Sequence, residues 1–142
     1  MKMTTEEAFV KVLQIHGIKH AFGIIGSAMM PISDLFPVAG IKFWDAAHEC
    51  NAGMMSDGFT RASGEMSMMI AQNGPGITNF VTPVKTAYWN HTPLLLVTPQ
   101  AANKTMGQGG FQEVEQMALF KDMVAYQEEV RDPTRTAEVL NR

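Results

Sequence analysis

The sequence has 142 residues, of which 46% are hydrophobic and 18% are charged, and its formal net charge at pH 7 is −3. This composition indicates one folded domain and excludes an intrinsically disordered chain. Because the charge is small and no run of like charges occurs, we expect neither a nucleic-acid nor a membrane partner. The single cysteine, Cys50, has no partner for an intramolecular disulfide, so we expect a reduced, cytoplasmic protein.

The chain alternates between helical and strand patterns along its length. A capping box of Thr4 and Glu7 predicts a first helix that ends at Gly17. Because right-handed crossovers join strands that alternate with helices, this order predicts an α/β fold with three layers, α/β/α, around a parallel sheet. The predicted strands span residues 20–25, 41–44, 66–71, 93–97 and 123–126, and the later helices span residues 28–36, 47–64, 77–89 and 113–120, with a last helix starting at Pro133.

The predicted helix at residues 47–64 has a face of small residues. On a 3.6-residue period, Glu49, Gly53, Ser56 and Thr60 lie along one stripe, so only small residues follow the carboxylate. Such a face permits close approach by a second helix or by a cofactor. A glutamate in a first helical turn also commonly complements the helix dipole at the surface, so the spacing alone leaves these interpretations open.

Several loops are predicted to meet at one edge of the sheet. The turn at Gly26 and Ser27, the turn at residues 72–76, the start of the Glu49 helix and the long loop at residues 98–110 all follow predicted strands. In parallel α/β sheets, ligands bind beyond the carboxyl ends of the strands. We therefore expect a ligand site at this edge, where helix starts offer free backbone N–H groups.

Five sequence blocks resemble one enzyme family. The pattern H-E-(x)7-D-G-F-x-R-x-S-G at residues 48–64 resembles the signature of the thiamine-diphosphate enzymes, specifically the pyrimidine-binding domain of the acetolactate synthase and 2-oxo-acid decarboxylase group. Four further blocks follow in the family's order: G-I-x-x-x-F-G at 17–23, N-G-P-G-I-T-N at 73–79, T-P-L-L at 92–95 and F-Q-E at 111–113. Within the family, the segments at 22–31, 72–76 and 87–113 are most similar to the sulfoacetaldehyde acetyltransferase branch.

The resemblance implies roles for particular residues. Glu49 would be catalytic, because the corresponding glutamate of the family hydrogen-bonds N1′ of the cofactor's aminopyrimidine. A Gln72 side chain that caps the following helix is as compatible with the pattern as one that contacts substrate. The residues implied to bind the cofactor are Ile25, Gly26, Glu49, Gly74, Pro75 and Asn79, those implied to face the substrate are Ser27, Gln72, Phe111 and Gln112, and no metal ligand is expected.

The branch resemblance also implies an activity. The expected enzyme uses thiamine diphosphate and Mg²⁺ to convert sulfoacetaldehyde and phosphate to acetyl phosphate and sulfite, as in taurine and sulfonate degradation. Two alternatives remain open: part of an acetolactate synthase-like enzyme or of a 2-oxo-acid or sulfopyruvate decarboxylase, and a non-catalytic dimerisation module. The family's arrangement implies a homo-oligomer, a dimer or tetramer, with the active site between subunits and a small-molecule substrate.

One motif of the family does not occur in the sequence. The diphosphate and magnesium motif, G-D-G followed by N-N, is absent. We therefore expect residues 1–142 to form a pyrimidine-binding domain without the diphosphate-binding domain. The resemblance also implies that the last strand of the family's sheet is missing. An N-terminal fragment of a longer enzyme and a natural small subunit both agree with this expectation. In either case, we do not expect the chain alone to hold the cofactor tightly.

Overall fold

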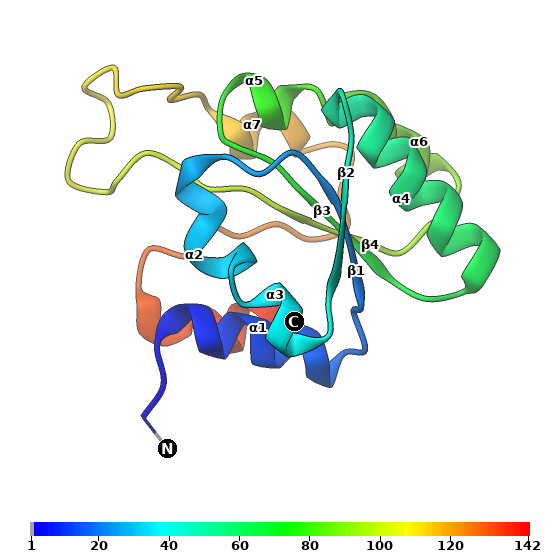
Figure 1. The fold of residues 1–142 in the computed structure, drawn as a ribbon. Coiled ribbons are helices and arrows are strands. Elements are labelled where there is room, and N and C mark those ends of the chain that lie inside the picture. Colours follow the sequence, from blue (N-terminus) through cyan, green and yellow to red (C-terminus); the bar gives the residue numbers. More distant parts are fainter. Residues whose placement is uncertain (1) are drawn as a thin grey trace.

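A computed structural model describes residues 2–142. Its centre is a parallel sheet with the strand order β2-β1-β3-β4 (Figure 1). The four strands are β1 (His20–Gly23), β2 (Lys42–Asp45), β3 (Ser67–Ile70) and β4 (Leu94–Val97). Each strand begins within one residue of its predicted position, and the predicted parallel α/β fold is confirmed.

Helices cover both faces of the sheet, and each face has its own apolar core (Figure 1). Side chains of β3 and the residue after it alternate between the cores: Met68 and Ile70 face one, and Met69 and Ala71 face the other. The first core packs under α1 (Thr5–Ile15), α2 (Met30–Ser33), α3 (Phe36–Ala39) and α8 (Thr136–Leu140). The second packs under α4 (Glu49–Ser63), α5 (Pro75–Thr78), α6 (Val81–Trp89) and α7 (Gln116–Phe120).

The predicted helix ends are confirmed where capping residues mark them. The Thr4 side chain accepts a hydrogen bond from the backbone of Glu7, and the Glu7 carboxylate accepts one from Thr4. Gly64 adopts the left-handed conformation, with φ of 75°, directly after α4. The caps therefore set the bounds of α1 and α4.

Two predicted helices are broken into shorter ones. Residues 28–36 form η1 (Ser27–Met29), a single turn of 3-10 helix, and α2, and a further short helix, α3, follows. Pro31 lies in the first turn of α2, and Pro37 lies in the first turn of α3. Because proline has no backbone N–H to donate, it interrupts a preceding helix but is tolerated where a new one begins. Residues 77–89 are interrupted between α5 and α6, where Phe80 N donates to Ile77 O in a tightened turn.

The prediction of a strand at residues 123–126 is wrong, since these residues do not join the sheet. A groove of about 1500 Å³ is lined by Leu94 and Leu96 of β4 and by Met123 and Val124 of this segment, which pack against the second core. Pairing requires a neighbouring strand about 4.8 Å away. Because the groove separates the segment from the edge of β4, its backbone finds no ladder partner there.

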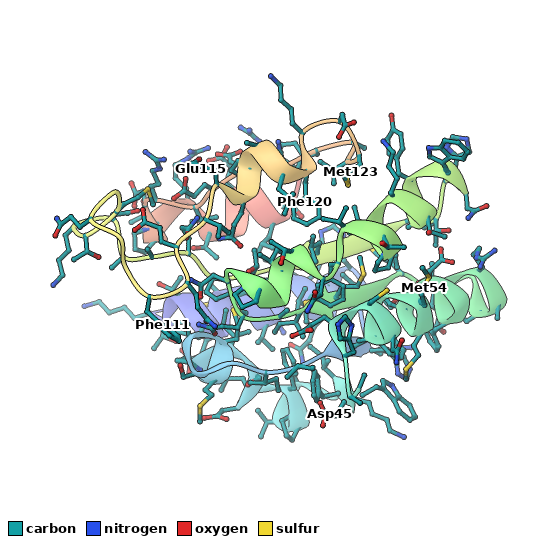
Figure 2. The ribbon with its side chains drawn as sticks, turned by 90° about the horizontal axis from the view of Figure 1, so that it is seen from above. Asp45, Met54, Phe111, Glu115, Phe120 and Met123 are labelled. Atoms are coloured by element: carbon teal, nitrogen blue, oxygen red, sulfur yellow. The ribbon has the colours of Figure 1, made fainter. Side chains whose placement is uncertain are left out.

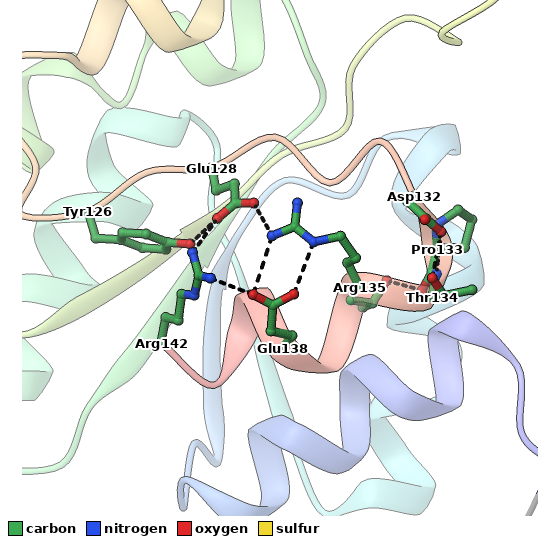
Figure 3. A network of polar contacts seen from close by, with 9 residues as sticks. Tyr126, Glu128, Asp132, Pro133, Thr134, Arg135, Glu138 and Arg142 are labelled. Carbon is green, nitrogen blue, oxygen red and sulfur yellow. Dashed lines mark hydrogen bonds and ion pairs between the residues drawn. The ribbon is translucent and has the colours of Figure 1, made fainter.

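Polar side chains at Tyr126 and Glu128 attach this segment to the residues on either side of α8 (Figure 3). One of these residues belongs to η2 (Pro133–Arg135), and the other follows α8. Glu128 accepts a hydrogen bond from Tyr126 and pairs with Arg135 at 2.8 Å and with Arg142 at 3.3 Å. Both arginines also pair with Glu138. The hydrogen bond from Tyr126 lowers the pKa of Glu128, and that from Arg135 lowers the pKa of Glu138. The network is thus a surface attachment that favours ionised carboxylates.

Candidate active site

The four strands end in register at one edge of the sheet. Gly23 pairs with Asp45 on one side and with Ile70 on the other, and Ile70 pairs with Val97. The start of α4, helix α5 and the loop after β4 gather beyond this edge (Figure 1). The loops that the sequence predicted to meet therefore lie where parallel α/β sheets bind ligands.

Glu49 is the first residue of α4 and is half-buried. The residue before it, His48, caps the helix, because its Nδ1 accepts a hydrogen bond from the Cys50 backbone N–H at 3.1 Å. Glu49 Oε2 accepts a hydrogen bond from Asn79 Nδ2 at 2.8 Å. Two predicted site residues, 30 positions apart, thus meet between the start of α4 and the end of α5.

The Gly74-Pro75-Gly76 turn lies against the other oxygen of this carboxylate. Gly74 has φ of 71° and ψ of −123°, a conformation open essentially to glycine alone, and Pro75 begins α5. A Cβ added to Gly76 would lie 3.5 Å from Glu49 Oε1. The turn therefore leaves space for a small group next to Oε1, the oxygen that Asn79 does not contact.

The small face of α4 is explained by packing. A Cβ added to Gly53 would lie 2.4 Å from a ring carbon of Pro83, so α6 approaches the helix at this point. Further along, Ser56 and Thr60 each hydrogen-bond the Ser67 hydroxyl of β3, at 2.7 and 2.8 Å. A second helix and a strand, and not a cofactor, therefore occupy this face beyond Glu49.

The predicted residues after β1 form a separate turn that packs on Gln72. Ile25 and Gly26 are half-buried, and Ser27 is exposed at the start of η1. A Cβ added to Gly26 would lie 2.2 Å from Gln72 Oε1, which shows how closely the two turns approach. Gln72 itself donates through Nε2 to Asn73 Oδ1 at 2.7 Å. The structure thus links this turn to the turn that follows β3.

Phe111 and Gln112 lie in the long loop after β4, where Phe111 is 84% exposed (Figure 2). The Gln112 backbone has φ of 56°, an unfavourable value for a residue with a side chain. Asn73, which the sequence analysis did not single out, donates to Gln112 O at 2.9 Å and to Phe111 O at 3.3 Å. The one available signal was its position, an amide side chain directly before the Gly-Pro-Gly turn.

Residues 2–142, the part of the chain that the structure describes, show neither a grouped metal site nor a membrane-spanning helix. In that range, no three or more histidine, cysteine, aspartate or glutamate side chains are grouped to hold a metal ion. None of its helices combines the length and apolar character needed to cross a membrane.

Comparison with known proteins identifies the family. Residues 3–119 match the family described as "Thiamine pyrophosphate enzyme, N-terminal TPP binding domain". The chain belongs to this family. Thiamine pyrophosphate is thiamine diphosphate, so membership supports thiamine diphosphate as the cofactor. The resemblance found in the sequence is therefore confirmed.

The chain is similar to several curated proteins over nearly its whole length. It is 87% identical over 142 residues to sulfoacetaldehyde acetyltransferase of Roseovarius nubinhibens, and 47% identical over 141 residues to that of Castellaniella defragrans. It is 31% identical over 143 aligned residues to acetolactate synthase of Arthrospira platensis. The alignments cover 98% to 100% of this chain but only 24% to 25% of those proteins. The chain thus spans about a quarter of the length of these relatives.

A solved structure has the same fold. The Rhodococcus jostii RHA1 thiamine diphosphate-dependent 4-hydroxybenzoylformate decarboxylase superposes with a TM-score of 0.90 at 23% identity. The superposition covers 98% of this chain and 26% of that chain. At this identity the likeness supports the fold alone.

The residues at the carboxyl edge fit one end of the cofactor. An aminopyrimidine is a flat ring with hydrogen-bonding nitrogens, and Glu49 Oε1 next to Gly76 offers such a ring a polar partner. Glu49 Oε2 is already held by Asn79, so the carboxylate keeps one orientation. The geometry therefore suits the part of thiamine diphosphate that the family resemblance assigns to this domain.

Proposed function

We propose that this chain is the pyrimidine-binding part of a thiamine-diphosphate-dependent sulfoacetaldehyde acetyltransferase, which converts sulfoacetaldehyde and phosphate to acetyl phosphate and sulfite. One observation carries the proposal: the Glu49 carboxylate is fixed by Asn79 on one oxygen and lies against the Gly-Pro-Gly turn on the other. The 87% identity to the Roseovarius nubinhibens acetyltransferase supports the choice of substrate.

The role of Glu49 is to share a proton with the aminopyrimidine through Oε1. Carbanion chemistry toward the aldehyde carbonyl would come from thiamine diphosphate when it is bound. Asn79 keeps the Glu49 carboxylate from rotating, so that Oε1 stays available for the proton. Helix α4 and the His48 cap hold the Glu49 backbone, which makes the carboxylate part of the rigid core.

The other predicted residues are assigned by their place at the edge. Ile25, Gly26, Gly74 and Pro75 form the turns on either side of Gln72 and would contact the aminopyrimidine with their backbones. The side chains proposed to face the substrates are those of Ser27, Gln72, Phe111 and Gln112. Ser27, Gln72 and Gln112 can donate hydrogen bonds to the oxygens of a sulfonate or of phosphate, whereas Phe111 would offer an apolar contact.

The diphosphate and Mg²⁺ sites are proposed to lie in polypeptide outside residues 1–142, in a cytoplasmic homo-oligomer, a dimer or tetramer, with the active site between subunits. We also propose that one further strand belongs to the sheet. The groove of about 1500 Å³ beside the half-buried strand β4 supports this, because its apolar walls and the free edge of β4 suit an added strand.

An acetolactate synthase-like enzyme is the second candidate, supported by the 31% identity to the Arthrospira platensis protein. It would use the same Glu49 chemistry on a 2-oxo acid. The two candidates differ in what leaves the substrate, since a 2-oxo acid releases carbon dioxide and sulfoacetaldehyde releases sulfite.

The test is a product assay on the full-length protein that contains this chain. Sulfoacetaldehyde, phosphate, Mg²⁺ and thiamine diphosphate are supplied, and sulfite and acetyl phosphate are measured together. We expect the two products in equal amounts. A parallel assay supplies pyruvate in place of sulfoacetaldehyde. Release of carbon dioxide from pyruvate, with no sulfite from sulfoacetaldehyde, would overturn the substrate assignment and favour the second candidate.

A further inference from the structure

Asn73 uses its whole side-chain amide to join two loops at the carboxyl edge. It is 4% exposed and follows β3, the central strand of the site. Its Nδ2 donates to Gln112 O at 2.9 Å and to Phe111 O at 3.3 Å, while its Oδ1 accepts from Gln72 Nε2 at 2.7 Å. A buried amide with donors and acceptor all engaged restricts the groups that it contacts.

The loop that Asn73 holds would not keep this conformation by local preference. Gln112 has a positive φ of 56°, which side-chain-bearing residues disfavour. It lies directly on Gly74, where an added Cβ would come within 2.7 Å of both Gln112 Cβ and Gln112 O. The Asn73 amide donates to the carbonyl of Gln112 itself and to that of the preceding residue, Phe111. Glu113 closes the loop on its own side by accepting from the N–H groups of Gly107 and Gly110, so Asn73 supplies the polar contact that holds the loop against the turn after β3.

Asn73 also links the loop to the turn after β1. Gln72, whose Nε2 binds Asn73, accepts through Oε1 from the Ala28 backbone N–H at 3.4 Å. One chain of amide contacts therefore runs from the turn after β1, through Gln72 and Asn73, to the backbone of Phe111 and Gln112. Three loops of the candidate active site are coupled through two neighbouring side chains.

We infer that Asn73 is a positioning residue, which fixes the loop that carries Phe111 and Gln112 beside the Glu49 site and connects it through Gln72 to the turn after β1. The exposed Phe111 side chain is then presented from an anchored backbone, which suits contact with a bound substrate. The statement about substrate rests on the proposed function, whereas the statement about the loop does not.

The first test is hydrogen exchange in the full-length protein that contains this chain. Asn73→Ala removes the contacts, and Asn73→Asp keeps the size and the acceptor but loses the donors. The control is Asn51→Ala, on the exposed face of α4. We expect both Asn73 variants to speed exchange at residues 107–113 by about tenfold or more, with α4 and β3 unchanged, and the control to match the parent.

Two outcomes of that test would overturn the inference. Exchange at residues 107–113 that equals the parent's in both variants would show that other contacts hold the loop. A rise spread evenly over β3, α4 and the loop would show that Asn73 supports the whole core and does not position the loop.

The second test is kinetic and addresses the substrate. In Asn73→Asp we expect kcat/KM for sulfoacetaldehyde to fall by about tenfold to a hundredfold. The half-saturating concentration of thiamine diphosphate should stay within about twofold, because Glu49 and Asn79 keep their contact. An equal loss in both quantities would contradict a loop-positioning role. Localised loop exchange without acetyltransferase activity in the parent would keep the positioning role and reject the proposed function.

Discussion

The regions on the two sides of β4 are stabilised in different ways. On one side, β3 is completely buried, and its Met69 packs with residues of α4 and α6 in the second core. On the other side lies the groove, and the segment beyond it combines apolar contacts of Met123 and Val124 with the second core and ion pairs of Glu128 with Arg135 and Arg142. Burial of a large apolar side chain contributes about 1.5–3 kcal/mol, whereas an exposed ion pair contributes about 0–1 kcal/mol. The comparison indicates that the helix carrying Glu49 is held mainly by apolar packing, whereas the segment beyond β4 relies on surface ion pairs as well.

The largest effect is expected from a cavity in the core next to α4. Phe80 is 0% exposed, so Phe80→Ala should lower the free energy of unfolding by about 3–5 kcal/mol in urea titrations. The matched control is Phe111→Ala, which removes a side chain that is 84% exposed and should change stability by about 0.5 kcal/mol or less. Equal losses in the two variants would contradict the division between a packed core and a solvent-facing loop.

A smaller effect is expected where α6 approaches α4. Gly53→Ala places a methyl group 2.4 Å from Pro83, which should cost about 1–3 kcal/mol through overpacking. Gly58→Ala, in the same helix but facing open space, should instead stabilise by about 0.5–1 kcal/mol, because alanine favours helix over glycine. Thermal unfolding of both variants checks the difference in sign. Destabilisation of similar size at both positions would mean that Gly53 is not an interhelical contact.

The smallest effect is expected when acid weakens the ion pairs of Glu128 and Glu138, which attach the segment beyond β4. The pKa values of Glu128 and Glu138 lie below the ordinary 4.5, so their contribution is fully present above pH 4.5 and is lost as the pH falls through the lowered values. We expect the side-chain N–H resonances of Arg135 to change in that acidic range before the core unfolds.

Arg135→Ala provides the control for the acid prediction. The variant should loosen the attachment of Glu128 at neutral pH with little loss of overall stability, because Arg135 and Glu138 are exposed and Glu128 keeps its pair with Arg142. Simultaneous acid unfolding of the segment and the core would show that the two regions are coupled.

The sequence predicted the parts of the fold that depend on local patterns. The capping box at Thr4 and the glycine at Gly64 set helix ends through neighbours in the chain, and both are confirmed. A strand at residues 123–126 also has a suitable local pattern, but strand formation requires a partner, and the groove separates this segment from β4. The predicted helix at residues 28–36 contains Pro31, and the structure starts the short helix α2 one residue before this proline because proline is favoured in a first helical turn.

The site was predictable to the extent that motifs fix it. Glu49 and Asn79 were singled out from separate motifs, and the structure joins them through one hydrogen bond. The importance of Asn73 could not be predicted, because its partners Phe111 and Gln112 lie 38 and 39 residues away. Contacts between loops depend on where the sheet places the loops, and a local sequence pattern does not predict that placement.

The central claim is that the Glu49 carboxylate activates the cofactor from a rigid core. The most direct measurement is sulfite release by the full-length protein that carries Glu49→Gln, compared with Glu65→Gln at an exposed position just beyond α4. We predict that Glu49→Gln lowers kcat by about 10²- to 10⁴-fold with an unchanged melting temperature, and that Glu65→Gln retains full activity. A Glu49→Gln enzyme that is folded and as active as its parent would contradict the account.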